Sequence, residues 1–265
     1  METSRLRVAV IGAGNVATHL ARALSGVADV VAVASRGGAS ACRLAERIGG
    51  GCKAVGLDLL PDDADLYLIA VSDDAVAEVA ASTPDYPGIW AHTSGSVPVD
   101  ALSGCKSRSG VFYPLQTFTR DVDVDVAEVP FFIEGSDSDT GKELMKLASL
   151  ISHRVEYADS DRRRQLHVAA VFACNFANLM WMEADEILRR GDLDLSYLMP
   201  LLKVTLGKLE HTSPRDAMTG PARRGDKGVI ERHRAMLHGD ERAVYTLLSD
   251  VILRDFGHDN INDDK

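Results

Sequence analysis

The sequence has no apolar run long enough to cross a membrane and no excess of positive charge. Its longest apolar stretches are far shorter than the roughly 18 residues that a membrane helix needs. The 265 residues include 29 basic and 39 acidic side chains, which give a net charge of −10. Such a balance disfavours nucleic acids and anionic membrane surfaces as partners. We therefore expect no nucleic acid and no membrane among the partners of this chain.

Cysteine is scarce as well. The four cysteines form no C-x-x-C pair and have no histidine at zinc-ligand spacing, so we expect no metal site. The stretch Met1–Arg7 is too short and polar for a signal peptide. We expect the thiols to be buried and reduced in a cytoplasmic protein. The cysteines are Cys42, Cys52, Cys105 and Cys174.

Residues 6–36, by contrast, have the pattern of a phosphate-binding unit. An apolar strand over Leu6–Ile11 leads into the sequence Gly-Ala-Gly-Asn-Val-Ala, which opens a helix over Val16–Ser25. A second apolar strand follows over Val30–Ala34. A G-x-G-x-x-A motif is weak on its own, but here it has its strand, helix and second strand at the expected spacing.

Each small residue of this motif has a physical reason. Gly12 permits the tight turn from strand to helix, and Gly14 lets the backbone approach a pyrophosphate. The small Ala17 lets the helix pack closely on the strand. The first helical turn, with Asn15 and Val16, offers N–H groups and a partial positive charge to phosphates. The motif therefore predicts a dinucleotide site that includes these residues.

The end of the second strand has no acidic residue. NAD sites usually place Asp or Glu about 20 residues past the glycines, to hold the ribose 2′-hydroxyl, whereas NADP sites avoid that charge and use Arg. Here Ser35 and Arg36 stand at this point. Arg36 can pair with a 2′-phosphate, with Ser35 hydrogen-bonding beside it. We predict NADP as the cofactor; the alternative is that Arg36 is simply solvated.

The remaining pattern predicts an α/β protein with an N-terminal doubly wound parallel (Rossmann) sheet followed by an all-α domain. Up to Ala158, short strands that are apolar throughout alternate with helices, as in a sheet covered on both faces. After Asp159 only helical patterns remain. We expect an NADP-binding Rossmann domain over 1–158 and a helical substrate and dimerisation domain over 159–265. Strands are expected at 65–71, 88–93, 110–115, 130–134 and 154–158, and helices at 40–48, 74–81, 138–152, 161–190, 196–209, 226–237 and 241–256.

Several polar residues follow the strands, where a doubly wound sheet holds its ligand. Val71 and Ser72 end one strand and should border the cofactor, although Ser72 or Asp73 could be an ordinary helix cap. His92 and Ser94 follow the next strand and could contact the cofactor. Ser94 could also hydrogen-bond a substrate, and His92 could transfer a proton, unless it is a satisfied core histidine.

The long helix after the sheet domain carries polar residues among apolar ones. At about 100° per residue, His167 and Asn178 lie within roughly 20° of each other. Asn175 lies about 60° from Asn178 on the neighbouring line. A polar stripe on an otherwise buried helix needs partners, which could be another helix, an internal water or a ligand.

The segment Thr219–Asp226 forms the last candidate site. Its Gly-Pro pair forces a turn, and Asp226 would cap the next helix. Arg223 and Arg224 on this turn could clamp a carboxylate or phosphate. The alternative is a capped turn between helices with solvated arginines.

Taken together, these residues resemble the NADP-dependent two-domain reductases. These include pyrroline-5-carboxylate reductase, prephenate dehydrogenase, the β-hydroxyacid dehydrogenases and the deazaflavin-linked NADP reductases. The chain is most similar to a family that joins such a Rossmann domain to a helical domain of unknown function. The resemblance implies NAD(P)-dependent hydride transfer and a dimer built through the helical domains. The residues that carry it are Gly12–Ala17, His92–Gly95, Tyr113–Phe118, His167 with Asn175, and Thr219–Asp226.

Two departures narrow the resemblance. Prephenate dehydrogenases have a His-Pro pair where this chain has Tyr113 and Pro114, which weakens a prephenate interpretation. The β-hydroxyacid enzymes have a Lys one turn before an Asn on the first interdomain helix. No Lys precedes Asn175 or Asn178 at that spacing, so that acid–base pair cannot be carried over.

We therefore predict an NADP-dependent oxidoreductase that moves a hydride to or from a small anionic carbonyl, imine or hydroxy-acid compound. Ser94, His167 and Asn178 are candidates for polarising the reacting atom, with His167 as the proton carrier because imidazole titrates near neutral pH. Arg224 is the candidate anchor for a substrate carboxylate. A homodimer is expected, unless the helices bury their apolar faces within one chain. The alternative function is a non-catalytic NADP-binding regulator or scaffold.

Overall fold

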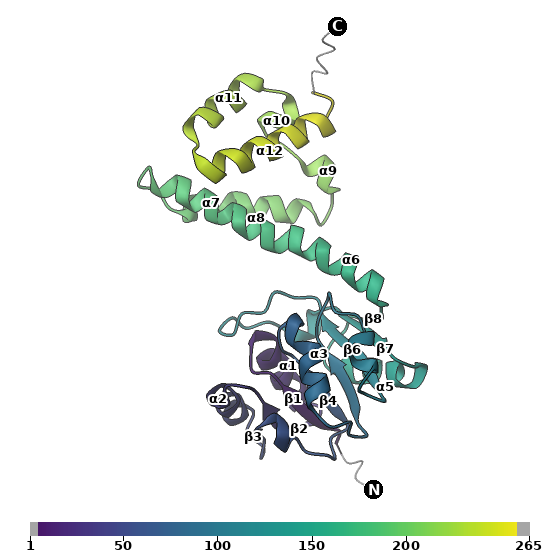
Figure 1. Cartoon of the computed structure of the whole chain (residues 1–265). Helices are drawn as coiled ribbons and strands as arrows, with labels where there is room; N and C mark the ends of the chain where they lie inside the picture. Colours follow the sequence, from purple (N-terminus) through teal and green to yellow (C-terminus); the bar gives the residue numbers. More distant parts are fainter. Residues whose placement is uncertain (1–4, 259–265) are drawn as a thin grey trace. The chain divides into compact units, whose positions relative to one another are not determined.

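The structure, a computed structural model, describes residues 5–258 and divides into two compact units (Figure 1). The N-terminal unit runs to Asn175 and holds the sheet, whereas the C-terminal unit begins at Phe176 and contains helices and no strand over its described residues. The predicted fold class, a doubly wound sheet followed by a helical region, is confirmed.

The N-terminal unit is built on one eight-stranded sheet with the strand order β3-β2-β1-β4-β5-β6-β7-β8. Helices and loops cover both of its faces (Figure 1). The strands are β1 (Arg7–Ile11), β2 (Asp29–Ala34), β3 (Lys53–Val55), β4 (Leu66–Ile69), β5 (Ile89–His92), β6 (Ser109–Pro114), β7 (Phe131–Gly135) and β8 (Val155–Tyr157). The helices are α1 (Asn15–Ser25), α2 (Gly38–Ile48), α3 (Asp73–Ser82), α4 (Asp100–Ser103), α5 (Ser138–Ala148) and α6 (Ser160–Ala170).

Side chains of the strands are buried on both faces of the sheet. On β1, Val8 and Val10 join the core cluster with α1, while Ala9 and Ile11 join the opposite cluster with α3 residues such as Val76. This two-sided burial explains why the strands are apolar throughout rather than alternating. Burying a side chain of this size is worth roughly 1.5–3 kcal/mol, so the sheet provides a rigid platform for the loops at its edges.

One strand pair departs from the predicted parallel sheet. Strands β6 and β7 are antiparallel, whereas all the other neighbouring strands are parallel. Parallel neighbours need a crossover connection, usually a helix. Residues 115–130, which join β6 to β7, contain only the 3₁₀ turn Val126–Glu128, so the chain returns along the neighbouring edge of the sheet. The carboxyl ends of β1 to β6 all meet at one edge, and β1 lies where the strand order reverses.

The predicted long helix over 161–190 is interrupted. Between α6 and α7 (Ala177–Arg189) the chain forms a π-helical segment over Val171–Phe176. The predicted alignment of His167 with Asn178 assumed an uninterrupted α-helix of 100° per residue, so its premise does not hold. Apolar side chains of this helix stay exposed within one chain, since Val168 is 56% exposed and Met182 is 61% exposed, which does not favour the alternative that the helices bury their apolar faces within one chain.

The C-terminal unit is a set of helices around a small core. Ala222, Ile230 and Leu253 are buried at its centre. Arg190 binds Glu241 bidentately at 2.5 and 2.9 Å, which ties the end of α7 to the first turn of α12. The remaining elements are the 3₁₀ turn Leu195–Leu198, α8 (Met199–Lys208), α9 (Pro214–Ala217), α10 (Pro221–Arg224), α11 (Lys227–Met236) and α12 (Gly239–Asp255).

Two expectations from the sequence concern membrane-spanning helices and the burial of the cysteines. Over 5–258, no helix is long and apolar enough to span a membrane. All four cysteines are free, but the prediction that they are buried is wrong. Cys42 and Cys174 are exposed, and Cys52 and Cys105 are half-buried and pack against the core clusters.

Candidate functional site

A groove of about 570 Å³ lies at the carboxyl ends of the central strands. The glycine turn after β1 forms its floor, and the tip of β2 and the start of α3 form its walls. Every predicted cofactor residue except His92 and Ser94 lines it. Those that line it are Gly12, Gly14, Asn15, Val16, Ser35, Arg36, Val71 and Ser72.

The two glycines of the turn serve different purposes. Gly12 has a φ of +122°, and a Cβ there would lie 2.2 Å from the carbonyl oxygen of Ala70, so only glycine fits. A Cβ on Gly14 would have no atom within 4 Å, so its absence opens space in the groove rather than relieving a contact. An empty position of this kind beside a helix start is what close approach of a phosphate requires.

The start of α1 is prepared for an anion. Gly14 is its N-cap, no side chain caps the first turn, and that turn contains no acidic residue. Its N–H groups and the positive end of the helix dipole are therefore available to a phosphate. At the tip of β2, Ser35 donates a hydrogen bond to the carbonyl oxygen of Gly37 at 3.0 Å, while Arg36 is exposed on the groove. These residues fit a dinucleotide with a 2′-phosphate.

His92 and Ser94 belong to a neighbouring cluster instead. His92 is fully buried, and its Nδ1 accepts a hydrogen bond from the backbone N–H of Ser94 at 3.2 Å. Burial and, to a smaller extent, the nearby positive charge of Arg163 together lower the pKa of His92 to about 4. The ring is therefore neutral, and because Nδ1 accepts, its proton lies on Nε2. This Nε2 is buried without a hydrogen-bond partner among the described residues, so His92 is a core histidine that is only half satisfied. Ser94 Oγ accepts from the N–H groups of Ser96 and Val97 at 3.1 and 3.0 Å, which shapes the loop after β5.

A tyrosine and a histidine meet beside this loop. The hydroxyl of Tyr113, at the end of β6, lies 3.1 Å from Nδ1 of His167 on α6. Burial raises the pKa of Tyr113 to about 12, so its phenol stays protonated at neutral pH. A Cβ on Gly95 would lie 2.7 Å from both His167 Nδ1 and Tyr113 Cζ. Glycine is thus needed where the loop passes this pair.

The loop is joined to the cofactor groove through α3. Ser96 donates a hydrogen bond to the carboxylate of Asp73, the first residue of α3. Ser72, the residue before Asp73, lines the groove. The Tyr113–His167 pair and the groove therefore share one edge of the sheet within the N-terminal unit.

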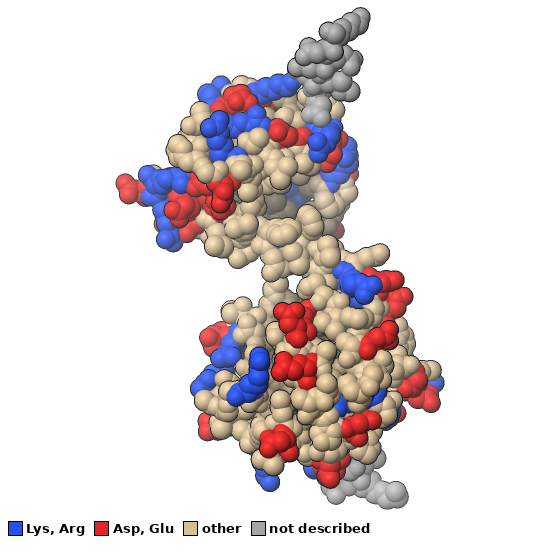
Figure 2. Space-filling view, in the orientation of Figure 1, with Lys and Arg blue, Asp and Glu red and all other residues tan. Residues whose placement is uncertain are grey.

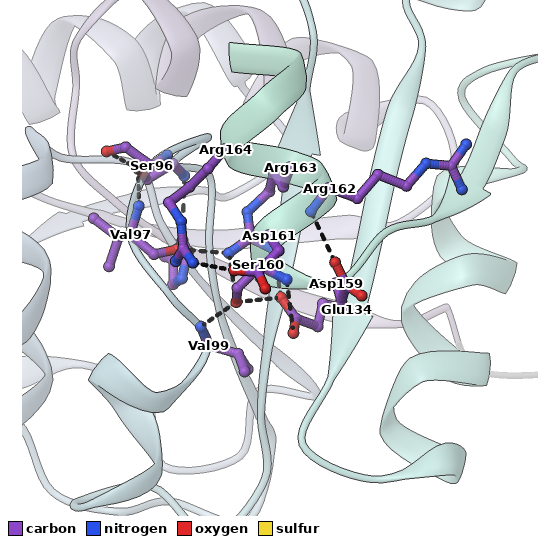
Figure 3. A network of polar contacts seen from close by, with 12 residues as sticks. Ser96, Val97, Val99, Glu134, Asp159, Ser160, Asp161, Arg162, Arg163 and Arg164 are labelled. Carbon is purple, nitrogen blue, oxygen red and sulfur yellow. Dashed lines mark hydrogen bonds and ion pairs between the residues drawn. The ribbon is translucent and has the colours of Figure 1, made fainter. Parts of the chain in front are cut away.

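A buried ion pair fixes the beginning of α6 under the same loop (Figure 3). Arg163 is fully buried and forms an ion pair with Glu134 of β7. Its Nη2 also donates to the carbonyl oxygen of Val97 at 2.6 Å. Ser160 completes the network, since its hydroxyl donates to Glu134 at 2.9 Å and accepts from the N–H of Val99 at 3.3 Å. Because Arg163 stands one helical turn before His167, the network fixes the position of His167 relative to the loop.

The other predicted site residues lie on exposed surfaces. Asn175 is the last residue of the N-terminal unit, and Asn178 lies in the first turn of α7. Arg224 forms an ion pair with Asp226 at 2.7 Å, and its side chain is 62% exposed. Asp226 occupies the N-cap position of α11, but its carboxylate accepts from Arg224 and makes no side-chain capping bond, so the predicted capping bond is wrong.

Sequence reasoning missed Glu134 and Arg163 as members of this site, and it named Gly95 only within the stretch His92–Gly95, without its packing role. Arg163 lies within the run Arg162-Arg163-Arg164, which is typical of a solvated face. The only local signal was its spacing of four residues from His167, which places both on one face of a helix. Among residues 5–258, no group of three or more His, Cys, Asp or Glu side chains is arranged to hold a metal ion.

Two family descriptions match the sequence. Residues 1–116 match a Rossmann-like domain, and residues 129–252 match the domain of unknown function DUF2520. The resemblance predicted from the motifs is therefore confirmed. No curated protein matches the chain.

Solved structures resemble the chain over nearly its whole length. A "putative NADP oxidoreductase" from Bacteroides fragilis is 38% identical, with a TM-score of 0.88 over 94% of this chain and 98% of that one. A protein from Thermotoga maritima is 21% identical, with a TM-score of 0.77 over 95% and 100% of the two chains. A reductive aminase from Aspergillus terreus in complex with NADPH and ethyl-5-oxohexanoate is 16% identical, with a TM-score of 0.69 over 98% and 97%.

The last two similarities concern the fold alone, whereas the identity to the Bacteroides protein extends over almost all of both chains. The chain therefore belongs to the family in which a Rossmann-like domain is joined to a DUF2520 domain, together with the Bacteroides fragilis protein.

Proposed function

We propose that this protein is an NADP-dependent oxidoreductase that transfers a hydride to or from a small anionic carbonyl, imine or hydroxy-acid compound. The observation that carries the proposal is the Tyr113–His167 pair at the edge of the sheet that also holds the dinucleotide-shaped groove. The name of the Bacteroides protein and the NADPH bound to the Aspergillus aminase support the choice of cofactor.

The groove residues hold the cofactor, which supplies or accepts the hydride when bound. The glycine turn and the first turn of α1 bind its phosphates, and Arg36 with Ser35 binds the 2′-phosphate. Val71 and Ser72 border it from the α3 side. The protein's remaining tasks are to orient the substrate and to move one proton.

His167 carries that proton at Nε2. In the neutral tautomer in which the Tyr113 hydroxyl donates to Nδ1, the ring proton lies on Nε2, which can then donate to a substrate oxygen or nitrogen. When the ring is doubly protonated, Nδ1–H donates to the tyrosine oxygen instead. Ser94 as a donor to the substrate remains a prediction, because its hydroxyl lies 3.4 Å from Ser96 Oγ, whose own O–H is donated to Asp73. Asn178 as a polarising residue and Arg224 as the carboxylate anchor remain predictions.

The enzyme is tested with a panel of keto acids, imines and hydroxy acids, followed by NADPH absorbance. We expect turnover that falls about a hundredfold or more in His167→Ala while NADPH still binds. The matched control is His153→Ala, an exposed histidine outside the site. NADPH binding without turnover on any compound, together with a protein partner gained or lost with NADPH, would favour the regulator or scaffold instead.

We also propose a homodimer formed through the helical unit. Apolar side chains on α7 and α8 are exposed in a single chain, including Met182, Leu201 and Val204 at 61%, 61% and 57%. An exposed apolar surface of this kind on a globular protein usually meets another subunit. Light scattering at micromolar concentration should give twice the mass of the chain, and a monomer would end this proposal.

The four free cysteines are consistent with a cytoplasmic protein.

A further inference from the structure

The segment that follows β6 is held against α1 by three contacts, all of them made by side chains of α1. The ring of His19 donates from Nε2 to the carbonyl oxygen of Thr119 at 3.0 Å. The same ring stacks on Phe118 with a centroid distance of 4.8 Å, and Phe118 lines the cofactor groove. Further along, Arg22 binds Asp123 at 3.4 Å. His19 is only 3% exposed, so the segment is held by a built contact and not by surface charge alone.

This attachment brings Arg120 to the glycine turn. Its Nη2 donates to the carbonyl oxygen of Ala13 at 3.0 Å, across 107 positions of the sequence. Ala13 stands between the two glycines of the turn, directly before the uncapped start of α1. The guanidinium of Arg120 and the positive end of α1 therefore lie on the same short stretch of backbone.

Arg120 belongs to a group of basic residues without acidic partners. Among the described residues, no carboxylate lies within 4 Å of the guanidinium groups of Arg36, Arg43, Arg47 or Arg120. The last three, with Ala13 and Ser40, border a small cavity of about 50 Å³ beside the main groove. Ala13 and Ser40 also line that groove. Figure 2 shows basic side chains over the α2 side of this unit and acidic ones over α3, although the chain as a whole is acidic.

We propose that Arg120 is a binding residue for the pyrophosphate of the dinucleotide, positioned over the glycine turn by His19 and Phe118. The proposal rests on the cofactor of the proposed function and assigns a contact that the glycine motif does not include. A guanidinium next to a helix N-terminus adds charge-assisted hydrogen bonds to those of the backbone. Arg36, at the tip of β2, would contact only the 2′-phosphate. The two arginines therefore differ in which dinucleotides they affect.

Fluorescence titrations with NADPH and NADH test this difference without any substrate. For Arg120→Ala we expect the affinities for NADPH and NADH to fall by the same factor, about tenfold, because both carry the pyrophosphate. For Arg36→Ala we expect a loss for NADPH alone. The control is Lys53→Ala, which removes one positive charge from an exposed residue at the amino end of β3, away from the glycine turn. The factor for Arg120→Ala should shrink as salt is raised, since Arg120 is exposed.

Each other result contradicts the proposal in a distinct way. If wild-type protein binds NADPH and Arg120→Ala binds both dinucleotides as tightly, the pyrophosphate contact is wrong while the proposed function stands. If Arg120→Ala loses affinity for NADPH only, Arg120 contacts the 2′-phosphate and the assignment to the pyrophosphate is wrong. If wild-type protein binds neither dinucleotide, both the proposed function and this contact fail.

Discussion

Replacing Glu134 by Gln should leave the buried guanidinium of Arg163 without its counter-charge. Arg163 is fully buried, and Glu134 is 17% exposed. Glutamine has nearly the same shape and keeps a carbonyl oxygen for Ser160, so the substitution removes charge with little change in volume. Breaking a buried ion pair by changing one partner destabilises a protein by about 3–5 kcal/mol. Since Glu134 retains some access to solvent, we expect the lower end, about 3 kcal/mol, out of a typical total of roughly 5–15 kcal/mol.

Urea unfolding followed by circular dichroism measures this change in the free energy of unfolding. The matched control is Glu143→Gln, whose carboxylate pairs with Arg108 at 2.8 Å on the surface and should change stability by less than about 1 kcal/mol. If Glu134→Gln is as stable as Glu143→Gln, Arg163 does not depend on Glu134 for its charge balance. The argument that this pair fixes the start of α6 would then be wrong.

The cluster beside the loop and the buried His92 give three further tests. Gly95→Ala would push a methyl group to within 2.7 Å of His167 Nδ1, so we expect turnover to fall more than about tenfold at unchanged NADPH affinity; full turnover would contradict the geometry. Tyr113→Phe removes the hydroxyl that binds His167, so kcat should fall about tenfold or more in steady-state assays, with the dissociation constant of NADPH unchanged. His92 has a pKa of about 4 in the folded chain against 6.5 when free, so between these values the unfolded chain takes up a proton that the folded chain excludes. Lowering the pH from 7 to 4 should therefore reduce the free energy of unfolding of wild type by about 3 kcal/mol more than that of His92→Gln in urea titrations, and equal slopes would refute the buried neutral ring.

The residues predicted from the glycine motif lie together in one groove, because the signals that mark them in the sequence are local. A strand, two glycines and a helix start lie within residues 6–25, and each residue acts on its immediate neighbours. Gly12 needs a positive φ, and Gly14 leaves open space, so both positions are specified by the backbone itself. The antiparallel direction of β7 had no such signal, because an apolar strand looks the same in either direction.

The rest of the site depends on residues that meet only after folding. In the sequence, Arg163 looks like a surface residue. Only in the folded chain does Glu134, 29 positions away, supply its counter-charge. Arg120 reaches Ala13 across 107 positions, and Gly95 is needed only because Tyr113 and His167 pass beside it. The π-helical segment over Val171–Phe176 is as apolar as a buried α-helix would be. The sequence therefore carries no sign that the helix changes its geometry there, and the predicted alignment of His167 with Asn178 failed for that reason.

The most direct test of the proposed oxidoreductase is the transfer of deuterium from NADPH that carries deuterium at both hydrogen positions of the nicotinamide C4. The protein and the labelled cofactor are incubated with the keto-acid and imine panel, and the masses of the products are measured by mass spectrometry. We predict one deuterium in the product with wild-type protein, and loss of that transfer in His167→Ala although this variant still binds NADPH. Wild-type protein that binds NADPH but transfers no deuterium to any compound would contradict the account, and so would undiminished transfer by His167→Ala.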